Sequence, residues 1–165
     1  MRIDMKSQTA GEEYPFFPLF VDLSGKKILL VGGGKIALRR IRTLVGFTER
    51  ITVVAPRLHP DLLPLETAGK LDVQRRAYAP GDVDGAFLVL AATNDPAVNE
   101  TVRLDCKRLG IPVNVSSDRQ GNDFYFPGIA RKGDYVAGVT ASGRDHAGAK
   151  KLTEAIRELL EKLDL

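Results

Sequence analysis

The sequence contains little of what several classes of protein require. Cys106 is the only cysteine among the 165 residues, which excludes an internal disulfide and a metal cluster held by several thiolates of one chain. The apolar runs are far too short to span a bilayer, and residues 1–13 lack the apolar centre of a signal peptide. We therefore expect a cytoplasmic protein with no membrane partner.

The net charge of the chain is also small. Twenty-four Lys and Arg residues face 21 Asp and Glu residues, which leaves a formal net charge of +3 spread along the chain. The sequence has no stripe of alternating aromatic and basic residues of the kind that binds single strands, so we expect no nucleic-acid partner. A basic pocket for an acidic small molecule accounts for the excess equally well.

Strands and helices are predicted to alternate through the first two thirds of the chain. Runs of bulky or β-branched apolar residues predict strands, whereas apolar residues at helical spacing predict helices. The strands are expected at 28–31, 51–55, 71–75, 87–91 and 112–115, and the helices at 35–45, 61–68 and 96–109. Asp95 and Gly110 are typical cap residues for the last of these helices. The alternation predicts a Rossmann-like, doubly wound parallel sheet of the α/β class.

The N-terminal end does not follow this pattern. Residues 1–13 are polar and read as a loose lead-in, and residues 14–23 are apolar but contain Pro15 and Pro18. This composition predicts an extended segment that lies against a core.

The C-terminal end also changes character. Short strands are expected at 124–126 and 135–140, followed by a helix over 146–163 with one apolar face. We predict an NAD-binding domain over residues 1–117 and a small α+β unit over 118–165. That unit is too small to be stable alone, so it must pack on the first domain or on a second subunit.

A glycine-rich motif lies between the first predicted strand and the first predicted helix. Residues 32–37 read GGGKIA, which matches G-x-G-x-x-A. In this motif Gly32 permits a tight turn, Gly34 lets the backbone approach a pyrophosphate, and Ala37 allows close helix–strand packing. Free N–H groups at the helix N-terminus would bind the phosphates. The context favours a dinucleotide site over a glycine-rich turn without a ligand.

The acidic residue that usually binds the ribose is missing at the end of the second strand. Pro56 and Arg57 occupy this place. Arg57 either meets a 2′-phosphate, which would indicate NADP, or is a solvated loop residue. The motif alone therefore leaves the choice between NAD and NADP open.

Polar residues follow the fourth and fifth strands, at the sheet edge where such folds bind ligands. Thr93 and Asn94 are expected to face the nicotinamide half, the alternative being a purely structural turn. Asp118 is the nearest carboxylate to a substrate at this edge, although an aspartate in a loop is more often a turn former. His146 is a candidate acid, base or metal-facing residue, or simply an exposed histidine.

Taken together, these segments resemble the precorrin-2 dehydrogenase family, which forms the N-terminal module of siroheme synthase. The resemblance starts near Phe17 and rests on VGGGKIALRR, AATND, and VNV followed by F-x-x-P. It implies NAD-dependent oxidation of precorrin-2, a tetrapyrrole with many carboxylates, to sirohydrochlorin. Some members also act as a sirohydrochlorin ferrochelatase, and an NAD-sensing module without catalysis is a further alternative.

The resemblance also implies a homodimer, in which the segment after the fifth strand is exchanged between subunits, and NAD as the cofactor. The cofactor contacts that it implies are Gly32, Gly33, Gly34, Lys35, Ile36, Pro56, Arg57, Thr93 and Asn94. The expected substrate contacts are Asn114, Ser142 and Arg144, and no resident metal site is expected.

Two departures from the family pattern concern catalysis. Many members carry an aspartate where this chain has Ser117, so the catalytic candidates are Ser117, the adjacent Asp118, and His146. Either Asp118 substitutes, or the reaction depends mainly on positioning of the substrate. The family segment G-x-S-P-x-L-A reads GRDHAGA at 143–149, and longer members continue beyond the position of Leu165. We therefore expect dehydrogenase activity ahead of chelatase activity.

Overall fold

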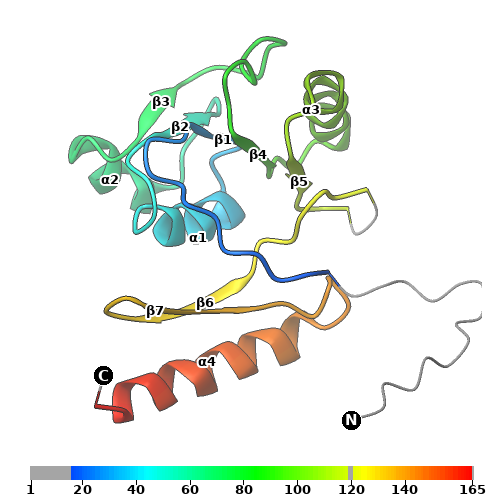
Figure 1. Cartoon of the computed structure of the whole chain (residues 1–165). Coiled ribbons are helices and arrows are strands. Elements are labelled where there is room, and N and C mark those ends of the chain that lie inside the picture. The colour runs from blue at the N-terminus through cyan, green and yellow to red at the C-terminus, as the bar shows by residue number, and fades with distance from the viewer. Residues whose placement is uncertain (1–15, 119–120, 165) are drawn as a thin grey trace, which may run out of the picture.

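A five-stranded parallel sheet forms the larger unit of the molecule (Figure 1). The computed structural model describes residues 16–118 and 121–164, so the predicted lead-in at 1–13 lies outside the described residues. The strand order is β3-β2-β1-β4-β5, which confirms the predicted Rossmann-like sheet. The strands are β1 (Ile28–Val31), β2 (Ile51–Val54), β3 (Asp72–Gln74), β4 (Leu88–Ala91) and β5 (Val113–Val115).

Helices cover both faces of this sheet. On one face, Ile28 and Leu30 of β1 join a core cluster with α1 (Lys35–Leu44), and the 3-10 helix η1 (Pro60–Leu62) contributes Leu62. On the other face, Leu29 and Val31 pack with side chains of α3 (Pro96–Leu109). Successive residues of a strand point to opposite faces, so a central strand covered on both sides is apolar at every position.

The boundaries of α3 follow from its cap residues, as predicted. The Asp95 carboxylate accepts hydrogen bonds from the N–H groups of Ala97 (2.9 Å) and Val98 (3.3 Å). At the other end Gly110 adopts a left-handed conformation with φ of 67°, which a side chain would disfavour. The sequence-predicted range of this helix is confirmed.

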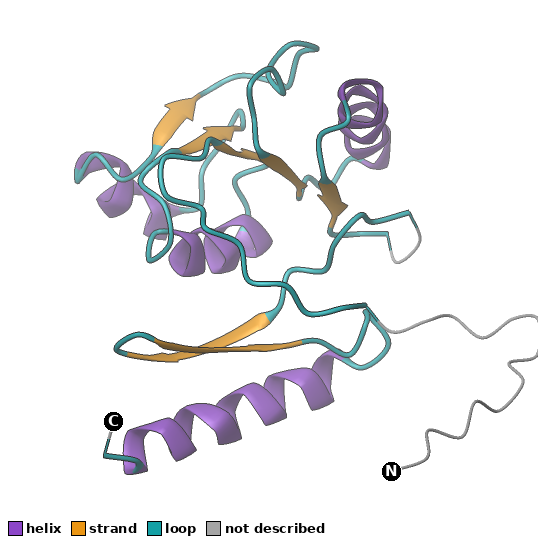
Figure 2. Ribbon diagram, viewed as in Figure 1, coloured by secondary structure: helices purple, strands orange, loops and turns teal. Residues whose placement is uncertain are grey.

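The smaller unit consists of a β-hairpin and one long helix. Strands β6 (Gly128–Lys132) and β7 (Tyr135–Val139) are antiparallel, and α4 (His146–Lys162) packs on them (Figure 2). The predicted strand at 124–126 is wrong, because residues 122 and 123 occupy the β5 edge with side chains. Asn122 Oδ1 accepts from the Val115 N–H at 2.6 Å, and Asp123 Oδ2 accepts from the Val113 N–H at 2.9 Å.

The apolar face of α4 is wider than the hairpin. Thr153 is its only buried residue among those described, and it lies against Gly128, where a Cβ would come within 2.2 Å of the threonine hydroxyl. Arg157 also donates to the carbonyl of Ile129 at 3.0 Å. Leu152 and Leu159 are nevertheless 54% exposed, so the hairpin leaves part of the predicted apolar face open.

The N-terminal segment passes between the two units (Figure 1). Leu23 packs against the sheet core, and the Phe16 ring meets the Tyr125 ring edge-on at 4.5 Å between centroids. Phe17 and Phe20 are 86% and 70% exposed. The expectation that residues 14–23 lie against a core is therefore wrong for most of the described part, because only its ends meet a packed surface. None of the described helices has the length and apolar content needed to cross a membrane.

Candidate dinucleotide-binding site

The glycine turn after β1 is shaped by two close backbone approaches. Gly32 has a φ of 113°, and a Cβ on it would lie 2.5 Å from the carbonyl oxygen of Ala92. A Cβ on Gly33 would lie 2.3 Å from the carbonyl oxygen of Arg57. Neither position has room for a side chain, because the loops that follow β4 and β2 press against the turn.

Gly34 is different, because its surroundings are open. No atom lies within 4 Å of a Cβ placed on it, and it is the N-cap of α1 without a side-chain cap. Gly34, Lys35 and Ile36 are exposed, and the first turn of α1 carries no acidic residue. An uncapped helix N-terminus with open space in front of it fits a pyrophosphate, whose oxygens would accept from the free N–H groups.

The loop after β2 lies beside this turn. The N–H of His59 donates to the carbonyl of Gly33 at 2.7 Å, which holds the loop against the glycines. Pro56 and Arg57 are both exposed there, at the place where a doubly wound fold holds the adenosine ribose.

Asn99, which sequence reasoning missed, connects the loops that follow β4 and β5. It is 2% exposed, and its Oδ1 accepts from the N–H of Thr93 at 3.1 Å. Its Nδ2 donates to the carbonyl of Thr93 at 3.0 Å and to the hydroxyl of Ser117 at 3.3 Å. Thr93 and Ser117 are thus brought together by a third residue. The sequence did contain a signal for it: Asn99 lies on the same face of the helix as the apolar Val102 and Cys106, where a polar residue indicates a buried hydrogen-bonding role.

The remaining candidates after these strands are exposed. Asn94 and Asp118 lie at the surface on the rim formed by the carboxyl ends of β4 and β5. The main chain of Asp118 is held at both ends: its N–H donates to Val115, and its carbonyl accepts from Asn122 Nδ2 at 2.8 Å. These two hydrogen bonds hold the main chain of Asp118 on this rim.

Asn114 lies in the interior between the two units. It is 3% exposed, and its Oδ1 accepts from Arg40 Nη2 at 2.6 Å. Its Nδ2 donates to the carbonyl of Phe124 at 2.8 Å. Arg40 is itself 5% exposed and lies over the Phe126 ring, while its Nε and Nη1 make no hydrogen bond with any described residue. Burial lowers the pKa of Arg40 to about 10.

Ser142, Arg144 and His146 belong to the smaller unit. Ser142 has a φ of 51° and precedes Gly143, whose position leaves no room for a Cβ beside the Tyr125 ring. Arg144 and His146 are exposed, and His146 is the first residue of α4. Its imidazole makes no hydrogen bond or ion pair with a described residue, Ser117 and Asp118 included.

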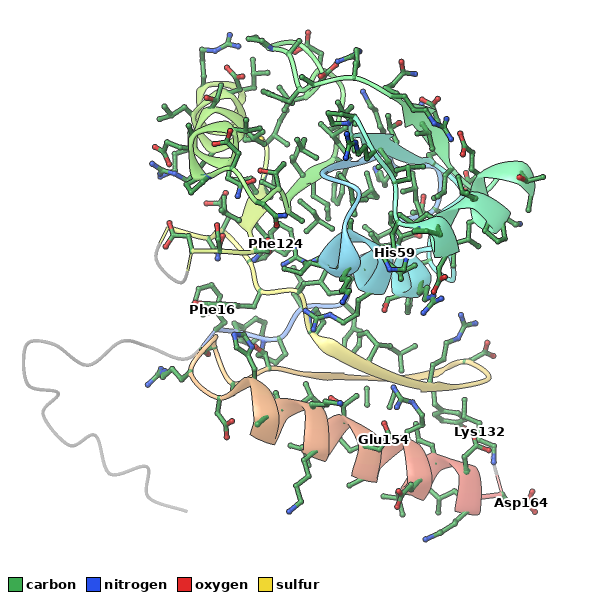
Figure 3. All side chains as sticks on the ribbon, turned by 180° about the vertical axis from the view of Figure 1, so that it is seen from behind. Phe16, His59, Phe124, Lys132, Glu154 and Asp164 are labelled. Atoms are coloured by element: carbon green, nitrogen blue, oxygen red, sulfur yellow. The ribbon has the colours of Figure 1, made fainter. Side chains whose placement is uncertain are left out.

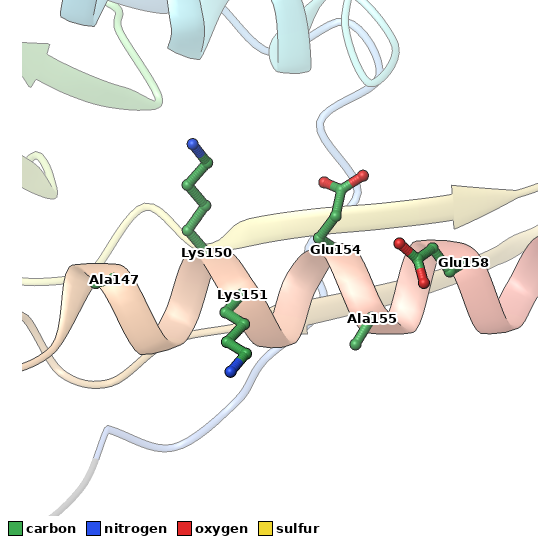
Figure 4. Close-up of a pocket in the computed structure, with 6 residues that line it drawn as sticks. All are labelled: Ala147, Lys150, Lys151, Glu154, Ala155 and Glu158. Atoms are coloured by element: carbon green, nitrogen blue, oxygen red, sulfur yellow. The ribbon is translucent and has the colours of Figure 1, made fainter.

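A hollow of about 510 Å³ lies elsewhere, on α4 (Figure 4). Lysine and glutamate side chains surround it, with Ala147 and Ala155 among the lining residues. All its lining residues belong to α4 and none to the glycine turn, so we assign the hollow to the open face of α4. Figure 3 shows Glu154 of α4 well apart from His59, which lies beside the turn.

Metal-ligating residues are scattered in the described part of the chain. Within residues 16–118 and 121–164, no three His, Cys, Asp or Glu side chains gather as they would around a metal ion. Burial raises the pKa of the Cys106 thiol to about 12, so this side chain is protonated and behaves as a core residue.

Comparison with known proteins supports the dinucleotide site. The model of a family described as "Putative NAD(P)-binding" matches residues 19–128. The probable multifunctional siroheme biosynthesis protein HemA of Ruminiclostridium josui is 41% identical over 152 residues, which are 92% of this chain and 30% of that protein. The siroheme synthase of Chromobacterium violaceum is 38% identical over 148 residues, which are 90% of this chain and 31% of that protein.

A solved structure agrees with these matches. SirC, a precorrin-2 dehydrogenase, superposes with a TM-score of 0.77 and is 29% identical; the match covers 87% of this chain and 70% of that one. The chain spans about a third of the length of the siroheme proteins it matches. The resemblance found in the sequence is confirmed, and the chain belongs to the NAD(P)-binding family that is also found as a module of siroheme synthases.

Proposed function

We propose that this chain oxidises precorrin-2 to sirohydrochlorin with NAD⁺, as a step of siroheme synthesis. The observation that carries the proposal is the open, uncapped helix N-terminus at Gly34, in a chain whose structural relative is a precorrin-2 dehydrogenase. When bound, NAD⁺ supplies a nicotinamide ring that can accept a hydride.

The residues of this chain would bind and orient the reactants. The N–H groups that follow Gly34 would hold the pyrophosphate, and the loop with Pro56 and Arg57 would lie at the adenosine ribose. Thr93 and Asn94 would lie at the nicotinamide end, beside the switch in strand order between β1 and β4, which is where doubly wound sheets bind their ligands. Asn99 would act as a positioning residue, since it fixes Thr93 relative to Ser117.

Loss of a hydride and a proton from precorrin-2 requires a proton acceptor. Asp118 is the exposed carboxylate on the rim after β5, and we assign it this role. Ser117, whose hydroxyl oxygen accepts from Asn99, would orient the substrate beside it. Ser142 and Arg144 would meet substrate carboxylates from the smaller unit, and Arg144 is exposed as that role needs.

The test is an anaerobic assay of the purified chain with precorrin-2 and NAD⁺. We expect absorbance to rise at about 340 nm as NADH forms, and Asp118→Asn to slow this rise at least tenfold, the usual scale of general-base loss. If the unmodified chain forms no NADH under these conditions, the proposal is refuted. Unchanged rates in Asp118→Asn would refute only the role of that carboxylate.

We also propose that the chain forms a homodimer through the smaller unit and lies in the cytoplasm. Leu152, Leu159 and Leu163 of α4 and Tyr135 of β7 are 42–55% exposed, and an isolated hairpin with one helix buries little apolar surface. Light scattering of the purified chain should give twice the mass of one 18.0 kDa chain. A mass of one chain at micromolar concentration would contradict the dimer.

A further inference from the structure

Three arginines follow the carboxyl ends of β2 and β3, at the adenosine side of the site. Arg75 forms a bidentate pair with Glu66 at 2.5 and 2.6 Å, and Arg76 pairs with Asp82 at 2.8 and 2.6 Å. Arg57 differs from both, since its exposed guanidinium makes no hydrogen bond or ion pair within the part of the chain that the structure describes.

The main chain at Arg57 is nevertheless held firmly. Its carbonyl oxygen packs against Gly33 so closely that a Cβ there would come within 2.3 Å of it. Two residues later, the N–H of His59 donates to the Gly33 carbonyl at 2.7 Å, and His59 Nδ1 accepts from the N–H of Asp61 at 3.2 Å. A charged side chain that pairs with no described residue thus projects from a backbone that is hydrogen-bonded to the glycine turn.

Among the described residues, the end of β2 carries no carboxylate that could select against a phosphate. Ala55 and Pro56 stand at the end of β2, where NAD-specific sites of this fold carry an acid that binds the ribose hydroxyls and repels a 2′-phosphate. The carboxylates of the helices that follow are already engaged, Asp61 with Arg42 at 2.9 Å and Glu66 with Arg75.

We propose that Arg57 receives the 2′-phosphate of NADP(H), so that this chain binds NADP(H) as well as NAD(H). The inference rests on the proposed dinucleotide site and concerns which nucleotide it accepts. A guanidinium can donate two parallel hydrogen bonds to phosphate oxygens, and none of its donors is committed to another described residue. NAD⁺ would still bind, because its pyrophosphate is held at Gly34 and not at Arg57.

The test measures dissociation constants of NAD⁺ and NADP⁺ by calorimetry on the full chain. The variants are Arg57→Ala, Arg57→Asp and the control Arg108→Ala. Arg108 is also an exposed arginine, but it lies at the C-terminal end of α3, whereas the end of α3 that faces the site is the N-terminal one. Circular dichroism verifies that each variant is folded.

We expect the unmodified chain to bind NADP⁺ within roughly tenfold of NAD⁺. Arg57→Ala should weaken NADP⁺ roughly tenfold to a hundredfold, the scale of lost hydrogen bonds to a charged group, and leave NAD⁺ within about twofold. Arg57→Asp should weaken NADP⁺ further, and Arg108→Ala should change neither constant.

The other possible outcomes separate the role of Arg57 from the dinucleotide site itself. Binding of NAD⁺ with NADP⁺ more than about a hundredfold weaker would refute the role of Arg57 and leave the proposed function intact. Equal weakening of both nucleotides by Arg57→Ala would also refute it, since the 2′-phosphate would then not be the group contacted. Failure of both nucleotides to bind the unmodified chain would refute the dinucleotide site itself.

Discussion

The two units of the molecule bury their apolar residues to very different extents. In the sheet unit, all four residues of β1 are at most 1% exposed, and two separate core clusters lie on the two faces. In the smaller unit, α4 has 17 residues, of which only Thr153 is buried. A sheet covered on both sides has a complete core within one chain, whereas a hairpin covered by one helix leaves apolar surface for another partner.

The largest effect is expected at the glycine turn of the sheet unit. Gly32→Ala should lower the free energy of unfolding by about 3 kcal/mol, because it combines a positive φ with a clash against the Ala92 carbonyl. The melting temperature of a domain this size would then fall by ~10 °C. Thermal melts followed by circular dichroism measure this.

Gly34→Ala is the matched control, since a methyl group there meets open space. It should melt within about 2 °C of the unmodified chain yet bind NAD⁺ less well, because the methyl group occupies the phosphate position. A large loss of stability in Gly34→Ala, or none in Gly32→Ala, would contradict the assigned geometry.

The next effect is expected at the junction between the units. Asn114→Ala removes the side-chain partner of the buried Arg40 guanidinium, and we expect it to cost about 2–3 kcal/mol in urea denaturation. Adding Arg40→Met removes the buried charge itself, so the double variant should regain about 1 kcal/mol or more. If the double variant instead loses as much free energy of unfolding as the two single variants together, Asn114 and Arg40 are not coupled.

A smaller effect on stability, with a change in assembly, is expected at α4. Leu152→Asp should change the free energy of unfolding of the single chain by less than about 0.5 kcal/mol, while light scattering shifts from two chains to one. The control is Leu104→Asp on α3, where the leucine is 55% exposed against 54% for Leu152. Loss of the dimer in both variants would mean that exposure alone, and not the α4 surface, governs assembly.

The smallest effect is expected from an ion pair of the sheet unit. The hydrogen bond from Arg76 holds the pKa of Asp82 below the usual range of an aspartate. The stabilisation is therefore present above the unfolded-state pKa and is lost as pH falls through the folded-state pKa. Asp82→Asn should destabilise the chain at neutral pH and less so at an acidic pH at which this carboxyl is protonated in the folded chain as well. Glu154→Gln on α4, where the carboxylate is 56% exposed, should change stability little at either pH.

Some elements could be predicted because their signals are local. The strand at 28–31 and the caps of α3 were expected at the observed residues, since burial on both faces requires a continuous apolar run and helix ends require particular residues. The strand β6 was missed. Its Arg131 and Lys132 break the apolar pattern, although the two residues Gly133 and Asp134 that follow are a typical hairpin turn.

The sequence by itself determined the parallel α/β sheet, the glycine turn and its family, because each depends on residues that are neighbours along the chain. Only the tertiary structure decided that Asn99 joins Thr93 to Ser117, that Asn114 is buried against Arg40, and that Arg57, beside the turn, pairs with none of the described residues. These contacts join loops and helices far apart in sequence, and their geometry depends on how the strands are ordered in the sheet. No local pattern records that order.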